Sequence, residues 1–223
     1  MALVRTALRR LRTAQRRSDG GFTIVEFLVA MGIFTGIIGV LMVAVTTMTS
    51  DVVKASNLSM SAESGRRAFA RLDRQVRYAT SINRPVLSGT TWYVEFVAPN
   101  KSGTATCHQW RLVTSTDQLQ QRSWTSGSTP TSTPSWETVA TNVVNNPSTQ
   151  KPFTFVAAST TVQTQGLDLL LVVTGGSSRG TGTVTIQSSL SARNATLDAA
   201  TTNDDADGDG DSDTEVCTEV SRS

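Results

Sequence analysis

Residues 20–31 read GGFTIVEFLVAM, and the apolar run that begins inside this stretch, residues 22–45, contains Glu26 as its single charged residue. A helix rises about 1.5 Å per residue, so a run of this length gives roughly 36 Å of helix, enough to cross a hydrocarbon core of about 30 Å with some tilt. The sequence therefore predicts one membrane-spanning helix, and it raises the question of why that helix contains a carboxylate.

The distribution of charge orients this helix. The chain of 223 residues has a formal net charge of +2, but residues 1–21 contain six arginines against one acid, Asp19, and the remaining 14 basic and 17 acidic residues give −3. Basic residues flank the cytoplasmic end of a membrane span, so we expect the N-terminus in the cytoplasm and the residues after the helix outside. The positive balance describes the first segment, and a nucleic-acid partner is not expected.

Secretory cleavage is the first alternative to a retained span. A signal peptidase site in AVTTMTSDV, residues 44–52, would release a soluble protein that starts near residue 48. The apolar run is longer than the 7 to 15 residues typical of a secretory signal, and a helical pattern continues after it. We therefore expect the membrane-inserted form.

The residues around Glu26 resemble the class III signal of type IV prepilins and type II secretion pseudopilins. The resemblance consists of a basic leader that ends in Gly21, followed by Phe22, TIV and a glutamate at the fifth position of the mature chain. It implies that a prepilin peptidase cleaves the Gly21–Phe22 bond on the cytoplasmic side and methylates the new N-terminus. It also implies, as partners, other pilin subunits, an inner-membrane assembly platform and, before assembly, membrane lipid.

The position of Glu26 agrees with a role in assembly. A charged residue at the centre of a membrane helix costs about 2.5 to 3.5 kcal/mol, so it needs a partner. Glu26 follows Phe22 by one turn, and in the resembled family this glutamate is thought to pair with the N-terminal amine of a neighbouring subunit. The alternative is a glutamate near the cytoplasmic interface that reaches water by itself. Gly32, Gly36 and Gly39 either allow close helix packing or reflect the glycine content of membrane helices.

Beyond the membrane the sequence predicts an α+β domain. The helix is expected to extend as an amphipathic segment that ends near Asn83, with Phe69, Leu72 and Val76 in one apolar stripe. From residue 91 the period changes to two in TWYVEFVAP, CHQWRLV, FTFVAA and TVTIQSSLSARNA, and LDLLLVV reads as a central strand. An antiparallel sheet packed on the helix is the economical fold. The expected parts are leader 1–21, membrane helix 22–46, amphipathic helix 47–83, sheet 84–200 and acidic tail 201–223.

The order of these parts is similar to the branch of minor pilins and pseudopilins that includes the J-type pseudopilin of type II secretion and the W-type minor pilin. The similarity consists of RRAFARLDRQVRYA after the span, CHQWRLVTSTDQLQQRSW, a later FTF strand and a closing strand that ends in SARNA. It implies a subunit at or near the filament tip that helps to initiate assembly. The machine to which the filament belongs, for secretion, adhesion, motility or DNA uptake, stays open.

Two stretches lack a regular period. Residues 123–152 are rich in Ser, Thr and Pro and predict a long surface loop with Trp124 and Trp136 at its edges, either adhesive or a solvated connection. The tail has alternating carboxylates and has Gly210 at position six of a loop counted from Asp205, as in calcium-binding loops. The twelfth position is Val216 where an EF-hand has glutamate, so calcium binding and a disordered acidic tail both stay open. The candidate ligands are Asp205, Asp207, Asp209, Asp211 and Asp213.

Residues suited to catalysis are few. Cys107 and Cys217 can form at most one internal disulfide, which would hold the acidic tail to the sheet in an oxidising exterior. The single histidine, His108, is adjacent to Cys107 in a predicted strand, where neighbouring side chains point to opposite faces. We expect no enzyme and no required cofactor. The rival function is a non-polymerising single-pass membrane protein whose exported domain binds calcium or a surface ligand.

Overall fold

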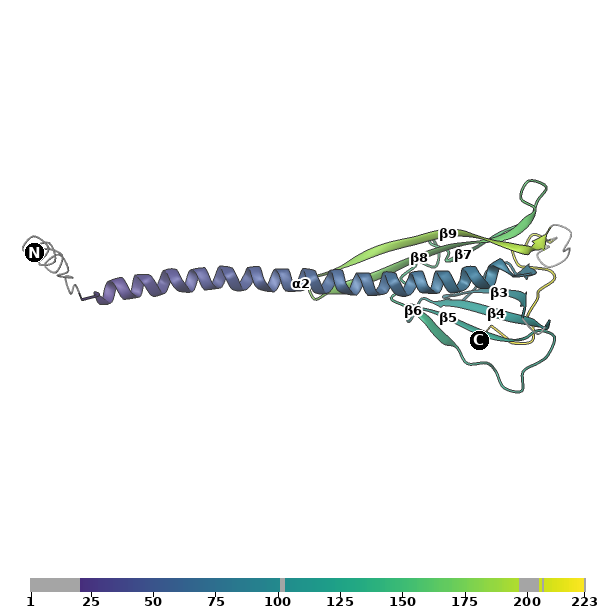
Figure 1. The fold of residues 1–223 in the computed structure, drawn as a ribbon, viewed down its shortest axis with the longest axis horizontal. Helices are drawn as coiled ribbons and strands as arrows, with labels where there is room; N and C mark the ends of the chain where they lie inside the picture. The colour runs from purple at the N-terminus through teal and green to yellow at the C-terminus, as the bar shows by residue number, and fades with distance from the viewer. Residues whose placement is uncertain (1–20, 101–102, 197–204, 206, 223) are drawn as a thin grey trace, which may run out of the picture. The chain divides into compact units, whose positions relative to one another are not determined.

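The computed structural model describes residues 21–100, 103–196, 205 and 207–222 (Figure 1). The expected leader lies outside these residues except for Gly21, as does part of the expected acidic tail. The chain divides into two compact units, Met1–Met48 and Thr49–Ser223. One long helix and two antiparallel sheets confirm the predicted α+β class.

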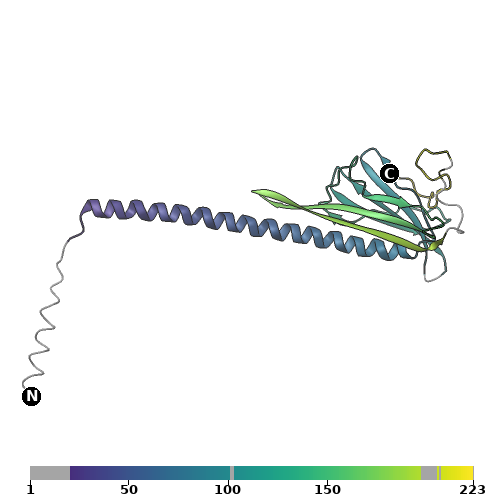
Figure 2. The ribbon, with the colours of Figure 1, turned by 90° about the horizontal axis from the view of Figure 1, so that it is seen from above.

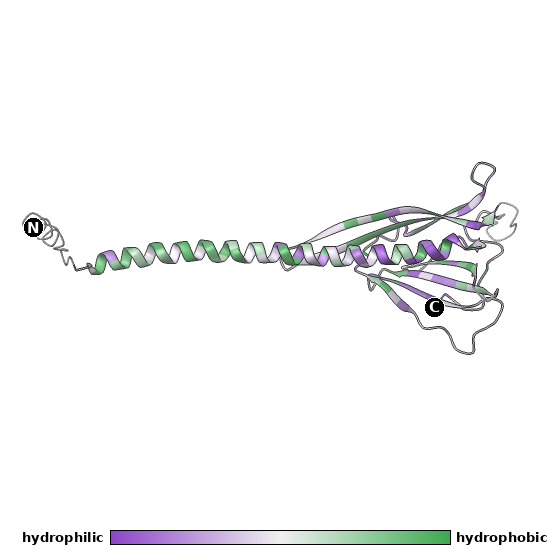
Figure 3. Cartoon of the chain, in the orientation of Figure 1, coloured by the Kyte–Doolittle hydropathy of each residue, from purple (hydrophilic) through white to green (hydrophobic). Residues whose placement is uncertain are grey.

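Helix α2 (Ile24–Arg77) begins after a threonine cap. The carbonyl of Thr23 accepts a hydrogen bond from Phe27 N at 3.2 Å, and Thr23 Oγ1 accepts one from Glu26 N at 3.3 Å, as in an N-cap. The large hydrophobic side chains of α2 as far as Met48 are all exposed, and this stretch is mostly green in Figure 3. Among the described residues α2 is the one helix long and apolar enough to cross a membrane, which is compatible with a single-pass protein.

Helix α2 ends at Arg77, before the expected end near Asn83. The backbone after it pairs with strand β3 (Thr91–Pro99): Thr80 N donates to Val97 O at 2.9 Å, and β1 (Ser81–Ile82) continues this antiparallel pairing. The predicted boundary was wrong because it relied on Pro85. A proline disfavours helix only in the residue before it, here Arg84, and does not show where the helix ends earlier in the chain. The edge of β3 provides hydrogen-bond partners that the local sequence does not reveal.

The larger sheet has the strand order β1-β3-β4-β5-β6, with β2 (Val86–Ser88) paired to β3. Its other members are β4 (Ala105–Val113), β5 (Gln118–Thr125) and β6 (Glu137–Thr141). Strands β3 and β4 are those predicted from TWYVEFVAP and CHQWRLV. Val94 lies opposite Trp110, whose indole N–H donates to Gln75 Oε1 of α2 at 2.8 Å. The predicted apolar face of these strands therefore lies against the helix.

The smaller sheet has the order β7-β8-β9, formed by β7 (Phe153–Val156), β8 (Thr164–Ser177) and β9 (Gly180–Thr196). Two sheets thus replace the single sheet that we expected. One face of the long β8–β9 hairpin is buried or half-buried: Leu167, Leu169, Leu171, Val173, Val184, Ile186, Leu190 and Ala192. Alternation predicted β7 and β9, and the continuous apolar run LDLLLVV predicted β8 as a central strand, which it is in this sheet. Neither pattern predicted the sheet to which these strands belong.

A short segment after β6 joins the two sheets. Val143 forms an antiparallel bridge with Val173 of β8, and Thr174 N donates to Asn142 O at 2.9 Å. Both β6 and this segment lie inside residues 123–152, which were predicted as one long loop, so that prediction was too broad. The Ser, Thr and Pro content concealed β6 because ETVAT is short and mostly exposed. Trp124 and Trp136 do lie at the two edges of the irregular part between β5 and β6.

The part of α2 in the second unit packs on the sheets through small side chains. Leu72 and Val76 of the predicted stripe are buried and Phe69 partly so, and the helix also buries Ser61, Ala62, Gly65 and Ala68. Gly175 of β8 approaches the helix so closely that an added Cβ would lie 2.3 Å from Leu58 Cα. Figures 1 and 2 show the β8–β9 hairpin running alongside α2. Glycine in the strand therefore permits this close helix–strand contact.

Replacing Gly175 with alanine should destabilise the second unit by about 1–3 kcal/mol, because the new methyl group meets the helix backbone at Leu58. Gly65→Ala is the matched control. Its Cβ would meet side-chain atoms and no backbone, Ile186 Cδ1 at 2.7 Å and Val173 Cγ1 at 3.3 Å, and the substitution gains about 1 kcal/mol of helix propensity. Chemical denaturation of the detergent-solubilised chain, followed by tryptophan fluorescence, measures both. Equal free energies of unfolding for the two variants would contradict this contact.

Candidate functional site

The predicted processing and assembly residues lie together at the start of α2. Gly21 and Phe22 precede the helix, and Phe22 is 80% exposed. Glu26 is the acidic residue of the first helical turn. The free backbone N–H groups of a first turn form the positive end of the helix dipole, which favours a carboxylate there. The Gly21–Phe22 peptide bond thus lies outside the helix, next to an exposed Phe22. The carboxylate of Glu26 follows one turn later.

Gly32, Gly36 and Gly39 of α2 are exposed, and nothing described lies within 4 Å of the Cβ that each would gain. Their spacing of four and three residues places them on one face of the helix. A face with small residues lets another helix approach closely in lipid. The predicted packing residues therefore form one small-residue face on a helix that is otherwise covered by large apolar side chains.

The arginines that follow in α2 are mostly paired with acids. Arg71 forms two hydrogen bonds with Glu137 of β6, at 2.7 and 2.8 Å, and Arg77 contacts Asp73, one helical turn earlier, at 2.6 Å. The hydrogen bonds from Arg71 help to lower the pKa of the Glu137 carboxyl. Arg71 thus attaches the helix to the edge of the larger sheet, in addition to facing solvent as an amphipathic helix predicts.

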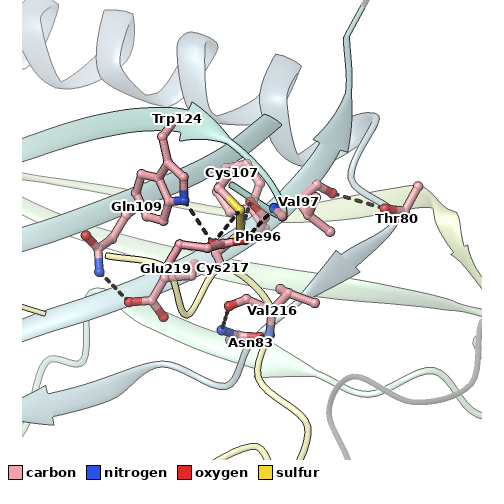
Figure 4. The surroundings of a disulfide bond; sticks show 12 residues. Thr80, Asn83, Phe96, Val97, Cys107, Gln109, Trp124, Val216, Cys217 and Glu219 are labelled. Carbon is pink, nitrogen blue, oxygen red and sulfur yellow. Dashed lines mark hydrogen bonds between the residues drawn. A yellow bond between two sulfur atoms is a disulfide. The ribbon is translucent and has the colours of Figure 1, made fainter. Parts of the chain in front are cut away.

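A disulfide holds the C-terminal segment, residues 207–222, on the side of the larger sheet opposite α2. Cys107 of β4 is bonded to Cys217, with their Cα atoms 5.5 Å apart (Figure 4). The predicted pairing is therefore confirmed, and Cys107 is no free thiol for a nucleophile with His108. Asn83 adds hydrogen bonds in both directions, donating to Val216 O at 2.8 Å and accepting from Val216 N at 3.0 Å.

Glu219 fixes the C-terminal segment to the end of β5. Its carboxylate accepts a hydrogen bond from the Trp124 indole N–H at 3.0 Å and another from the backbone N–H of Gly127. Burial alone would raise the pKa of Glu219, but these hydrogen bonds outweigh it and the pKa is lowered. The ionised side chain therefore matches two donors that the fold supplies.

A buried polar network lies beneath the C-terminal segment. Glu95 of β3 is 2% exposed, and its carboxylate accepts hydrogen bonds from Arg222 at 3.0 and 3.1 Å and from Gln109 at 2.8 Å. Arg122 donates to Gln109 Oε1 at 2.6 Å and to the carbonyl of Ser221. Contacts with Glu95 and a contact with Glu215, opposing the effect of burial, raise the pKa of Arg222. A buried charge needs such a partner.

We did not predict this network from the sequence. Alternation places Glu95 on the face of its strand opposite Val94 and Phe96. The available signal was that its neighbours on that face, Tyr93 and Val97, are apolar, which indicates a covered face. Both are buried in the structure. The covering segment starts more than 100 residues later, and no local pattern predicts that contact.

His108 lies on the opposite face of β4, toward α2. Its ring centroid is 5.3 Å from that of Phe96, and its Nδ1 is buried without a hydrogen-bond partner among the described residues. Burial, with a smaller contribution from the positive charge of Arg71, lowers the pKa of His108 to about 4. The histidine is therefore neutral at neutral pH and packs as part of the interior.

Three of the five predicted calcium ligands lie close together. The carboxylate oxygens of Asp205, Asp207 and Asp209 are within 4.8 Å of one another, while Asp205 also contacts Arg84 at 3.5 Å. Gly210 N donates to Asp205 Oδ1 at 3.2 Å, and φ of Gly210 is 95°, a conformation that glycine adopts without strain. Asp211 and Asp213 are outside this group. At the twelfth position, the backbone of Val216 is hydrogen-bonded to Asn83.

Removing the guanidinium of Arg222 should leave Glu95 buried without its cation. We expect Arg222→Ala to lower the free energy of unfolding by about 2–3 kcal/mol, below the 3–5 kcal/mol of a fully buried pair because the Arg222 side chain is 24% exposed. Arg193→Ala, at an exposed position of β9, is the control. Adding Glu95→Gln to Arg222→Ala should restore part of the loss. Equal denaturation midpoints for the two arginine variants would contradict the role of the network.

If the acidic loop binds calcium, titration of the detergent-solubilised chain with calcium should release or absorb heat in the millimolar range or below. Asp209→Asn should weaken binding at least several-fold, because carboxylate charge sets the affinity of such loops. Asp168→Asn, in β8, is the control. Absence of heat with millimolar calcium would retire the metal site.

No protein-family model, curated protein or solved structure matches the chain in comparisons with known proteins. Support for a function therefore comes from two sets of residues, the segment from Gly21 to Gly39 and the C-terminal segment with the sheet beneath it.

Proposed function

We propose that this protein is a pilin-like structural subunit, a minor pilin or pseudopilin that enters a filament through its N-terminal helix and helps to start assembly at or near the tip. The observation that supports this most directly is Glu26, a carboxylate in the first turn of an otherwise apolar and exposed helix. That helix begins just after the Gly21–Phe22 bond. The resemblance to the class III prepilin signal rests on the same residues.

Processing is the first step of the proposal. A membrane peptidase cleaves between Gly21 and Phe22 on the cytoplasmic side, and Phe22 becomes the N-methylated first residue. The bond lies before the Thr23 cap and outside the helix, so cleavage does not require α2 to unwind. The processed subunits then remain anchored in the membrane by residues 24–48 until they assemble.

Assembly is the second step. The new amine at Phe22 stays protonatable after methylation and lies one turn from Glu26 in its own chain. In lipid each charge costs free energy unless it is paired. Pairing Glu26 with the amine of an adjacent subunit therefore favours entry into a filament. The face formed by Gly32, Gly36 and Gly39 permits close approach of the neighbouring helices.

Location is the third part of the proposal. The six arginines before the span favour a cytoplasmic N-terminus, and the second unit is displayed outside. The Cys107–Cys217 disulfide supports this orientation, because disulfides persist in oxidising compartments and are rare in the cytosol. The partners are the peptidase, an inner-membrane assembly platform and other subunits.

A second candidate function is a single-pass membrane protein that never polymerises and whose exported unit binds calcium. The proximity of Asp205, Asp207 and Asp209 favours it. The N-terminal residues distinguish the two candidate functions. A calcium-binding protein of this kind needs neither cleavage at Gly21 nor a carboxylate at Glu26.

Replacing Glu26 with alanine should leave cleavage and membrane insertion intact but reduce recovery in sheared filaments at least about tenfold, equivalent to about 1.4 kcal/mol of lost pairing. Glu63→Ala is the matched control, since Glu63 is an exposed acid of the same helix that contacts Arg67 at 3.7 Å. The measurement compares cleaved protein in membranes with protein in the filament fraction. Equal recovery of Glu26→Ala and wild type would refute the pairing.

A further inference from the structure

The irregular segment between β5 and β6, residues 126–135, has the sequence SGSTPTSTPS and is called here the hydroxyl loop. Figure 1 shows it projecting away from the sheet between these strands. Six of its residues expose a hydroxyl-bearing side chain: Ser128, Thr129, Thr131, Ser132, Thr133 and Ser135. Pro130 and Pro134 fix φ at two positions and favour extended backbone around them.

The hydroxyls of the loop are not used by the fold. Among the described residues, none of these six side chains has a hydrogen bond. Ser and Thr in loops commonly bond to nearby backbone, and this chain provides an example at Ser159, whose Oγ accepts from Val162 N at 3.0 Å. The hydroxyl loop instead presents every one of these six oxygens to solvent.

The two ends of the loop are firmly attached. At the first end Ser126 N donates to Ala105 O at 3.0 Å, and Trp124, 6% exposed, is bonded to Glu219. At the second end the ring of Trp136 lies against two guanidinium groups, with Arg111 Cζ at 3.9 Å and Arg122 Cζ at 4.2 Å from its centroid. Cation–π contacts of this kind stabilise the ring position. The loop between the two tryptophans is thus anchored at both ends, and its six hydroxyl-bearing residues are exposed.

We propose that the hydroxyl loop is a site of O-linked glycosylation. A Ser or Thr hydroxyl of the loop attacks the anomeric carbon of a sugar activated as a glycosyl phosphate. A carbon–oxygen bond forms to the side chain, the bond from the anomeric carbon to the phosphate oxygen breaks, the phosphate leaves with the electron pair, and the hydroxyl proton passes to a base of the transferase. An accessible, extended backbone with several free hydroxyls is what a transferase must bind.

The charges around the loop favour a neutral sugar over phosphate. Residues 123–136 contain no charged side chain. The acids at its ends are Glu219, hydrogen-bonded to Gly127 N, and Glu137, which follows Trp136 directly. The two guanidinium groups at Trp136 are already engaged, since Arg111 donates to Gln120, and Arg122 donates to Gln109 and to the carbonyl of Ser221. A phosphate ester adds negative charge and needs a cluster of cations or amides, whereas a sugar needs none. The inference does not depend on filament assembly, because a glycan on this loop requires only that the loop is exposed.

The test is the mass of the full chain purified from its native membrane, followed by reduction and cleavage after glutamate, which yields residues 96–137 as one fragment. We expect this fragment to be heavier than its sequence by whole monosaccharide residues, and alkaline β-elimination should remove the excess. A variant with all six exposed hydroxyl residues of the loop changed to alanine should lose it. The matched control, Thr181, Thr183 and Thr185 of β9 changed to alanine, should keep it.

Tryptophan fluorescence verifies that both variants fold, so loss of the added mass in the loop variant is not a folding defect. A fragment 96–137 of unmodified mass would overturn the proposal. So would an added mass equal to phosphate, or sugar that persists in the loop variant. Cleavage at Gly21 is scored separately in the same intact mass, so failure of the glycan inference is distinguishable from failure of the proposed function.

Discussion

The constraint on which the rest depends is the apolar surface of the first half of α2. Its large hydrophobic side chains from Ile24 to Met48 are exposed among the described residues, and burying one such side chain is worth about 1.5–3 kcal/mol. Water is therefore an unfavourable surrounding, and lipid or other apolar helices must cover this surface. Glu26 is the single charged residue there. In the proposed function, its position in the first turn favours a positively charged partner, the N-terminal amine of an adjacent subunit.

The second half of the same helix is the framework of the second unit. Gly175 allows helix and strand to approach closely, and one face of the larger sheet packs on α2. The opposite face is covered by the C-terminal segment, which the Cys107–Cys217 disulfide and the Glu95–Arg222 pair hold in place. Strand β3 is consequently buried on both faces. The stability of β3 therefore depends on α2, which covers one face, and on the C-terminal segment, which covers the other.

Local pattern was sufficient for much of this fold. Hydropathy predicted the span, the period of two predicted β3, β4, β7 and β9, and the continuous apolar run LDLLLVV predicted β8. It did not predict the division into two sheets, because alternation shows which face a strand buries but not which strand it pairs with, and β7 pairs with β8 and not with β6. Nor did it predict the pairing of Glu95, whose partner is near the end of the chain. The roles of Gly21 and Glu26 require a peptidase and a neighbouring subunit, so they stay predictions.

The central claim is that the chain is processed for assembly at its N-terminus. The most direct measurement is the N-terminal peptide and intact mass of the protein purified from its native membrane, from cells with an active prepilin peptidase. The account predicts a chain that starts at an N-methylated Phe22. A chain that still contains the residues before Gly21 would contradict it, and Glu26 would then require a partner other than the amine of a neighbouring subunit.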